Sequence, residues 1–234
     1  MKRFPALLLA SLAALLTGCG NAPGYPPNAS ARPADVTDFA TLYSENCAAC
    51  HGANGHNGPA NDLANPEYQA LVNDATLRKW ISGGMPGTEM PAFAQSAGAM
   101  LTDAQVDALI AGMRERWLQP GAFAGTAPPP YAQAQAGDAR KGAQGYQARC
   151  SACHAPSHQQ ITSPDYLAVV GDQALRSIII AGRPDIGQPD WSHLGPGGKS
   201  AAPLSAEDVD NIVAYLASLR SSAPAAQATN NSPK

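Results

Sequence analysis

The sequence has no surplus of basic residues: 15 Lys and Arg stand against 18 Asp and Glu, which gives a formal net charge of −3. Nucleic-acid binding requires a basic patch, so this composition excludes nucleic acid as an expected partner. No stretch alternates between apolar and polar residues as a half-buried strand does, so a β-sheet is excluded and an all-α protein is predicted. Methionine is absent after Met113, which limits the metal ligands available in the second half of the chain.

The N-terminal segment has the pattern of an export signal. Residues 1–18 combine the basic Lys2 and Arg3 with an apolar stretch through Leu16, which is too short to span a membrane. The sequence "LTGC", which ends at Cys19, is similar to a bacterial lipobox, in which the cysteine is lipidated; the alternative is an ordinary signal with an unpaired cysteine. Cleavage before Cys19 leaves a net charge of −5, and lipidation anchors the protein on the periplasmic side of a bacterial membrane.

Three segments are rich in small and polar residues and poor in large apolar ones. They cannot bury a core, and they predict a tether at 19–34, a Pro/Ala-rich linker at 120–136 and a disordered tail at 221–234. Two compact units remain, at 35–119 and 137–220. The length of the linker predicts that the two units move relative to each other.

The two units are copies of one pattern. Three segments of the first copy recur in the same order in the second: 43–51 with 146–154, 65–78 with 163–176, and 101–110 with 204–213. Only the loop lengths between these segments differ. An internal repeat of this kind predicts one fold used twice in tandem.

Each copy is expected to end in a helix that begins with a capping box. Thr102 and Gln105 in the first copy, and Ser205 and Asp208 in the second, have the required spacing. The apolar residues that follow them recur at helical period. A further helix is expected to lead into each cysteine motif.

A shorter helix is expected in the middle of each copy. Asp74 and Asp172 can serve as its N-caps, because a carboxylate at this position accepts hydrogen bonds from the free N–H groups of the first turn. Glycines terminate the same helices, at Gly83-Gly84 in the first copy and at Gly182 in the second.

Each copy contains the pattern CxxCH, formed by Cys47, Cys50 and His51 and by Cys150, Cys153 and His154. Cysteines three apart on a helical turn lie on one face, so both sulfurs can reach the two vinyl groups of one haem, and the adjacent histidine can reach the iron. A zinc site would need four ligands from both motifs, whereas each motif lies within its own unit. A thiol redox motif is expected beside a βαβ pattern, which is absent, and a disulfide across three residues would constrain little. The motifs therefore predict two covalently attached haem c groups.

With haem assigned, residues 35–118 and 137–220 each resemble a class I cytochrome c. The resemblance implies a methionine sixth ligand on the loop before the last helix, and Met90 in "MPAF" matches that position. Met85 is the competing candidate, but it lies closer to the preceding helix and is expected to pack against the porphyrin. Met113 falls on the apolar face of the last helix and Met100 just ahead of it.

The resemblance also implies a hydrogen bond to the proximal histidine. Gly58-Pro59 matches the family's loop whose proline carbonyl accepts a hydrogen bond from the histidine Nδ1. The second copy is five residues shorter in this region and has no obvious Gly-Pro, so the sequence does not predict a hydrogen-bond partner for the proximal histidine of this copy. His56 and His158 are expected to be solvated loop residues.

The second copy cannot supply a thioether, because all five methionines precede it. Gln188 aligns with Met90, counted from the glycine that both loops share. Three candidates remain for the sixth position of the second iron: His193, Gln188 or no protein ligand. His193 is chemically the best ligand, and it lies 39 residues after His154, the separation of Met90 from His51. Lys199 and His158 are remoter candidates.

The resemblance implies an electron-transfer protein rather than an enzyme. It favours a lipid-anchored di-haem cytochrome c on the periplasmic side of the membrane, similar to cytochrome subunits of quinol-oxidising respiratory complexes, with redox proteins as partners. Loss of the thioether lowers the potential of the second haem, so electrons are expected to enter there and leave from the first. The alternatives are a haem enzyme of the peroxidase or sulfur-oxyanion dehydrogenase type with an open second haem, and a gas sensor.

Overall fold

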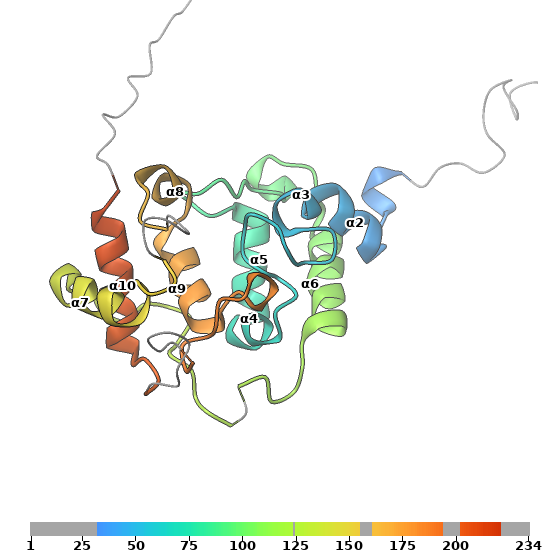
Figure 1. Ribbon diagram of the computed structural model, residues 1–234. Coiled ribbons are helices and arrows are strands. Elements are labelled where there is room, and N and C mark those ends of the chain that lie inside the picture. The colour runs from blue at the N-terminus through green and yellow to red at the C-terminus, as the bar shows by residue number, and fades with distance from the viewer. Residues whose placement is uncertain (1–31, 124, 155–160, 194–201, 221–234) are drawn as a thin grey trace, which may run out of the picture. The chain divides into compact units, whose positions relative to one another are not determined.

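The structure, a computed structural model, describes residues 32–123, 125–154, 161–193 and 202–220 (Figure 1). The predicted signal segment, Cys19, most of the tether, His158, Lys199 and the tail lie outside these residues. The described residues from Thr37 onward belong to one compact unit, which contains both copies of the repeat.

The described residues form helices and turns and no β-strand, which confirms the all-α prediction. None of their helices is long and apolar enough to cross a bilayer. In the first copy the α-helices are α2 (Phe39–Asn46), α3 (Ala48–His51), α4 (Pro66–Leu71), α5 (Asp74–Gly83) and α6 (Asp103–Trp117). In the second copy they are α7 (Ala139–Arg149), α8 (Pro164–Val169), α9 (Asp172–Ala181) and α10 (Ala206–Ser218). Short 3₁₀ helices are η1 (Pro33–Asp35), η2 (Gln95–Ala97) and η3 (Pro184–Ile186).

Both predicted capping boxes are present at the starts of the last helices, α6 and α10. The Thr102 side chain accepts from the Gln105 backbone N–H, and the Gln105 side chain accepts from the Thr102 backbone N–H. Ser205 and Asp208 make the same reciprocal pair at α10. Each box satisfies two N–H groups of the helix terminus, so local sequence fixes these helix starts.

The prediction that Asp74 and Asp172 are N-caps was wrong. Both residues are the first residue of their helix; Asn73 caps α5, and Gly171 precedes α9 without a side-chain cap. Each carboxylate instead pairs with an arginine from the last helical segment: Arg114 binds Asp74 at 2.7 Å and Arg220 binds Asp172 at 2.5 Å.

The same two arginines bind backbone carbonyls at the C-terminal end of the helix that precedes each aspartate. Arg220 donates to the carbonyls of Leu167 (2.8 Å) and Val170 (2.7 Å). Arg114 donates to the carbonyls of Gln69 and Val72, at equivalent positions of the first copy. In each copy one guanidinium therefore satisfies the free carbonyls at a helix end and ties the C-terminal segment of the copy to its middle helices.

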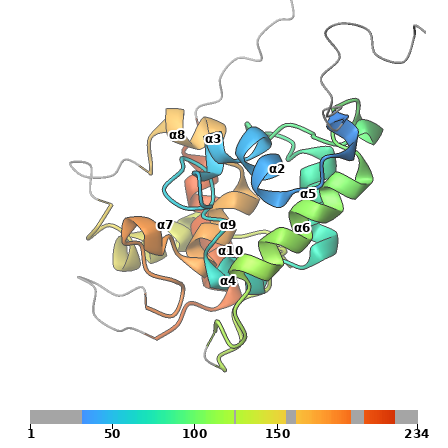
Figure 2. The same ribbon diagram turned by 90° about the vertical axis from the view of Figure 1, so that its right-hand side faces the viewer.

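The first and last helices of each copy approach closely at a glycine. In the first copy α2 and α6 lie side by side (Figure 2), and a Cβ on Gly112 of α6 would lie 2.2 Å from the Phe39 ring. In the second copy α7 packs against α10 (Figure 1), and a Cβ on Gly142 of α7 would lie 1.8 Å from the Asn211 carbonyl oxygen. Gly142 permits close contact with the α10 backbone, whereas Gly112 makes room for the Phe39 ring.

Gly142→Ala is expected to destabilise the protein by about 1–3 kcal/mol, because the new methyl group meets rigid backbone and α7 must move away from α10. Chemical denaturation of the haem-loaded protein, followed by helical circular dichroism, measures the loss. Gly83→Ala is the matched control, since a Cβ there meets nothing within 4 Å. A variant at Gly142 as stable as the control would contradict this account of the helix contact.

Part of the linker is fixed, contrary to the expectation of a flexible connection. The Trp80 indole N–H donates to the Tyr131 hydroxyl at 2.8 Å, and the Gln173 side chain donates to the Tyr131 carbonyl at 2.8 Å. The buried Arg176 donates to the carbonyls of Pro130 (2.8 Å) and Tyr131 (3.1 Å). Composition predicted a segment with no core of its own, but polar groups of both copies hold this part of it.

Candidate functional site

The second CxxCH motif forms one wall of a cavity of about 390 Å³. Cofactor pockets have volumes of roughly 300–1,000 Å³, and most of their lining is apolar. Cys150, Cys153 and His154 line the cavity together with aliphatic and aromatic side chains, among them Ile161, Leu175, Ile178, Ile179, Ile212, Leu216, Tyr146 and Tyr166. Two thiols and an imidazole in an apolar cavity are the donor set that a covalently attached haem requires.

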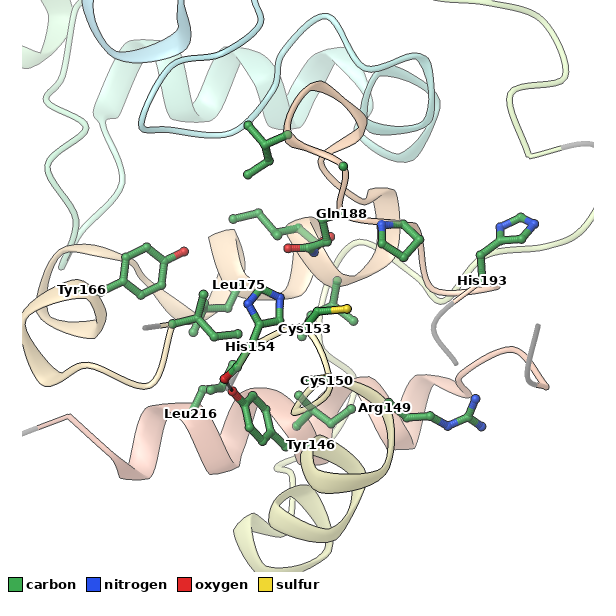
Figure 3. A pocket seen from close by; sticks show the side chains of 17 residues that line it. Tyr146, Arg149, Cys150, Cys153, His154, Tyr166, Leu175, Gln188, His193 and Leu216 are labelled. Atoms are coloured by element: carbon green, nitrogen blue, oxygen red, sulfur yellow. Dashed lines mark hydrogen bonds between the residues drawn. The ribbon is translucent and has the colours of Figure 1, made fainter. Parts of the chain in front are cut away.

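Gln188 and His193 lie differently in this cavity (Figure 3). Gln188 faces His154 across the cavity, while the His193 ring lies at one end and points away. The Gln188 amide donates to the Ile178 carbonyl at 3.2 Å. The His193 side chain is 68% exposed, and its Nδ1 is hydrogen-bonded to Asp190 Oδ2 at 2.6 Å. The structure thus brings Gln188, rather than His193, to the position opposite the proximal histidine.

The loop turns that carry Met90 and Gln188 are closed by an equivalent backbone hydrogen bond, although they differ inside, where only the second contains a 3₁₀ helix, η3. The Met85 N–H donates to the Met90 carbonyl at 3.0 Å, and the Arg183 N–H donates to the Gln188 carbonyl at 2.9 Å. These equivalent hydrogen bonds place Met90 in register with Gln188, and Met85 with Arg183. The alignment derived from the sequence therefore matches the backbone.

The glycine before each turn shows the same equivalence. Gly84 has a φ of +71° and Gly182 a φ of +72°, in the left-handed region that glycine favours. A Cβ at either position would lie 2.8 Å from a carbonyl oxygen, that of Met90 in one copy and that of Gln188 in the other. Glycine at this point lets each ligand loop fold back against the preceding helix.

The other methionines have separate environments. Met113 is 3% exposed and lies in the core on α6, as its helical spacing predicts, whereas Met100 is 80% exposed. Met85 and Met90 are both half-buried. Met90 therefore keeps its predicted ligand role on position, and Met85 remains its competitor.

The proximal side of the first motif differs from the prediction. The His51 ring Nδ1 is hydrogen-bonded to the carbonyl of Asn61 at 2.8 Å, so Pro59 is not the partner. A Cβ on Gly58 would lie 2.2 Å from the Cys50 carbonyl oxygen, and the Ala60 N–H donates to that oxygen at 2.9 Å. This tight packing brings the carbonyl of Asn61 onto the imidazole. The corresponding loop of the second copy includes residues 155–160, which lie outside the described residues.

Burial sets the protonation of the motif side chains. It lowers the pKa of His51, while the hydrogen bond to Asn61 raises this pKa and Arg183 lowers it. Burial also raises the pKa of Cys47 to about 12 and that of Cys150 to about 11. All four described cysteines are free, and no group of three or more His, Cys, Asp and Glu side chains in the described ranges could hold a metal ion.

Two tyrosines support the motifs, and sequence reasoning did not identify them. The Tyr43 hydroxyl donates to the Gly52 carbonyl at 3.1 Å, and the Tyr146 hydroxyl donates to the His154 carbonyl at 3.0 Å. Each bond ties the incoming helix, α2 or α7, to the end of its CxxCH turn. The available signal was a tyrosine four residues before the first cysteine in both copies.

His56 is not simply solvated, as the sequence suggested. Its Nδ1 lies 2.8 Å from Oδ1 of Asp62, and its side chain is 43% exposed whereas that of Asp62 is 1% exposed. Burial raises the pKa of Asp62, and the contact with His56 lowers it. The pair fixes the loop that contains Asn61.

Comparisons with known proteins give a result for each copy. Residues 34–111 match the family described as cytochrome C oxidase, cbb3-type, subunit III, and residues 139–220 match the family described as cytochrome c. The chain is 34% identical over 109 residues to the dihydro-heme d1 dehydrogenase of Pseudomonas aeruginosa, which covers 47% of this chain and 18% of that protein. A solved structure of dihydro-heme d1 dehydrogenase NirN in complex with DHE is 30% identical, covers 41% of this chain and 18% of its own, and has a TM-score of 0.30. The chain thus spans less than a fifth of the length of these relatives.

Proposed function

Since the chain belongs to the c-type cytochromes and carries two such domains in tandem, with the haem electron-transfer role of that class, we propose that it relays electrons between two redox partners. The donor is a membrane-associated protein, such as a quinol-oxidising complex. The acceptor is a periplasmic protein or a terminal oxidase. The observation that carries the proposal is that each CxxCH motif is followed by a ligand loop, with Met90 in the first loop and Gln188 at the matching position of the second.

The residues present fit a covalent haem in each domain. Cys47 and Cys50, and likewise Cys150 and Cys153, would form the thioether bonds, while His51 and His154 would each provide one axial ligand. When bound, the haem iron supplies reversible one-electron chemistry. In the first domain the Asn61 carbonyl holds the His51 ring, and in the second domain the aliphatic lining of the cavity would exclude water from the haem.

For the sixth position we propose Met90 in the first domain and Gln188 in the second. Gln188 already faces His154, whereas His193 would have to leave Asp190 and turn inward. A thioether is a soft ligand that favours ferrous iron and raises the potential, whereas an amide oxygen is a hard ligand that favours ferric iron. The second haem should therefore have the lower potential, so an electron would enter at the second haem and leave from the first.

Membrane attachment belongs to the same proposal. Export through residues 1–18 and lipidation at Cys19 would place the protein on the periplasmic side of the membrane, where the tether would raise its effective concentration near a membrane partner. Metabolic labelling with a radioactive fatty acid tests this part, because Cys19→Ser should abolish incorporation into the protein.

The electron-transfer proposal predicts two haems per chain, of which one has a thioether ligand. Protein matured in the cell should show two covalently bound haems by mass spectrometry, and its ferric spectrum should show a thioether-to-iron charge-transfer band from one haem only. If fewer than two haems were bound, the relay would be excluded.

A haem enzyme is the second candidate, and the His193–Asp190 pair favours it. His193 lines one end of the second cavity and, with Asp190 hydrogen-bonded to it, could transfer protons to or from a molecule bound there. Addition of carbon monoxide to the reduced protein separates the two functions. Rapid binding to half of the haem would favour an enzyme or a gas sensor, and the absence of binding would favour the relay.

A further inference from the structure

Arg183 lies in the turn that carries Gln188, but its guanidinium binds the other domain. It donates to the Ala60 carbonyl through Nη1 at 2.8 Å and to the Gly58 carbonyl through Nη2 at 2.9 Å. The residue is only 6% exposed. A buried guanidinium that binds two carbonyls fixes the position of a loop with little freedom.

Asp185 completes this contact from the same turn. It accepts from Arg183 Nε at 2.9 Å and from Arg183 Nη2 at 2.8 Å, and it also accepts from the Asn57 backbone N–H at 2.8 Å. Arg183 lowers the pKa of Asp185 to about 2, so the carboxylate is charged. A buried ion pair of the second domain is thus bonded to three backbone groups within residues 57–60.

Arg183 and Asp185 bind the loop that orients the proximal histidine of the first domain, His51. Gly58 and Ala60 pack on the Cys50 carbonyl, and the next residue, Asn61, supplies the carbonyl that binds His51. A second bond joins the same regions: the buried Asn65 side chain donates to the Ala181 carbonyl at 2.8 Å, at the end of α9.

The first domain has no equivalent of this arginine. In the matching turn the residue in register with Arg183 is Met85. The contact is therefore a property of the tandem arrangement rather than of the repeated fold.

We propose that Arg183 is a positioning residue for the haem of the other domain: it holds loop 57–61, and hence His51, from the turn that carries the sixth-position residue of the second haem. The inference rests on the proposed function, because it requires a haem on the first motif. If the inference holds, the reduction potential of the first haem depends on the ion pair between Arg183 and Asp185 of the second domain.

The two members of the pair should shift the potential of the first haem in opposite directions. Arg183→Met removes a buried cation and leaves Asp185 without its partner; both changes favour the ferric state and lower the potential. Asp185→Asn removes the anion and keeps the cation, so the potential rises. Arg183→Lys keeps the charge without the forked geometry and should give a smaller fall than Arg183→Met.

The experiment is a redox titration of full-length haem-loaded protein followed by electron paramagnetic resonance, which resolves the two ferric haems by their axial ligands. NMR of the His51 ring N–H adds a second readout, with faster hydrogen exchange expected in Arg183→Met. Arg78→Met is the matched control, since it removes one cation whose partner is the exposed Asp107. The control should leave the first haem's potential unchanged.

Shifts of the same sign in Arg183→Met and Asp185→Asn would show simple loosening of the fold and would overturn the proposal, as would an unchanged potential in both. If Arg183→Met fails to fold, the rise in Asp185→Asn and the fall in Arg183→Lys still decide the matter. A haem count on every sample distinguishes failure of the proposed function from failure of this inference. Fewer than two haems in the native protein contradicts the proposed function. Two haems with unchanged potentials in the variants contradict only the role of Arg183.

Discussion

Gln188→Met is expected to raise the midpoint potential of the second haem. Residue 188 is in register with residue 90 and its side chain faces His154, so a methionine there should present its sulfur toward the face opposite that histidine. Axial-ligand identity moves haem potentials over roughly 0.8 V, which makes this the largest redox effect expected from one substitution. Optical redox titration and a second thioether-to-iron band measure it.

The reciprocal change, Met90→Gln, should lower the potential of the first haem and remove its thioether band. Met100→Gln serves as the control, because Met100 is 80% exposed and should leave both haems unaltered. An unchanged second haem in Gln188→Met would show that another group occupies the sixth position. His193→Ala would then identify that group, because loss of a histidine ligand opens the iron to carbon monoxide.

Arg176→Met is expected to cost about 3–5 kcal/mol of unfolding free energy, the usual effect of removing one partner from a buried ion pair. The side chains of Arg176 and Asp210 are 2% and 6% exposed. The substitution leaves the Asp210 carboxylate buried without its cation, and it removes the donors to the carbonyls of Pro130 and Tyr131. Chemical denaturation of the haem-loaded protein gives the change in stability.

The repeat supplies a control at the equivalent position. Arg78 and Asp107 form the same ion pair in the first domain, but their side chains are 45% and 60% exposed. Arg78→Met should therefore cost only about 0–1 kcal/mol, as is usual for a surface pair. Equal losses in the two variants would contradict the role assigned to burial. Limited proteolysis adds a second readout, with faster cleavage near residue 130 expected only in Arg176→Met.

Local sequence was sufficient to predict the features that depend on neighbours within one or two turns. The CxxCH motifs, the capping boxes at Thr102 and Ser205, and the glycines that end α5 and α9 all involve groups within a few residues of one another. The comparison of the two copies added the register of Met90 with Gln188, because a repeated fold repeats its turns. These conclusions needed no knowledge of tertiary packing.

Tertiary structure decided which distant group each polar side chain meets. Asp74 pairs with Arg114 rather than capping its helix, and His51 binds the carbonyl of Asn61 rather than that of Pro59. Arg183 binds the loop before Asn61 although the two are separated by more than 120 positions in the sequence. A buried donor must find an acceptor, but several are within reach of any long side chain or loop, and only the packed chain selects among them.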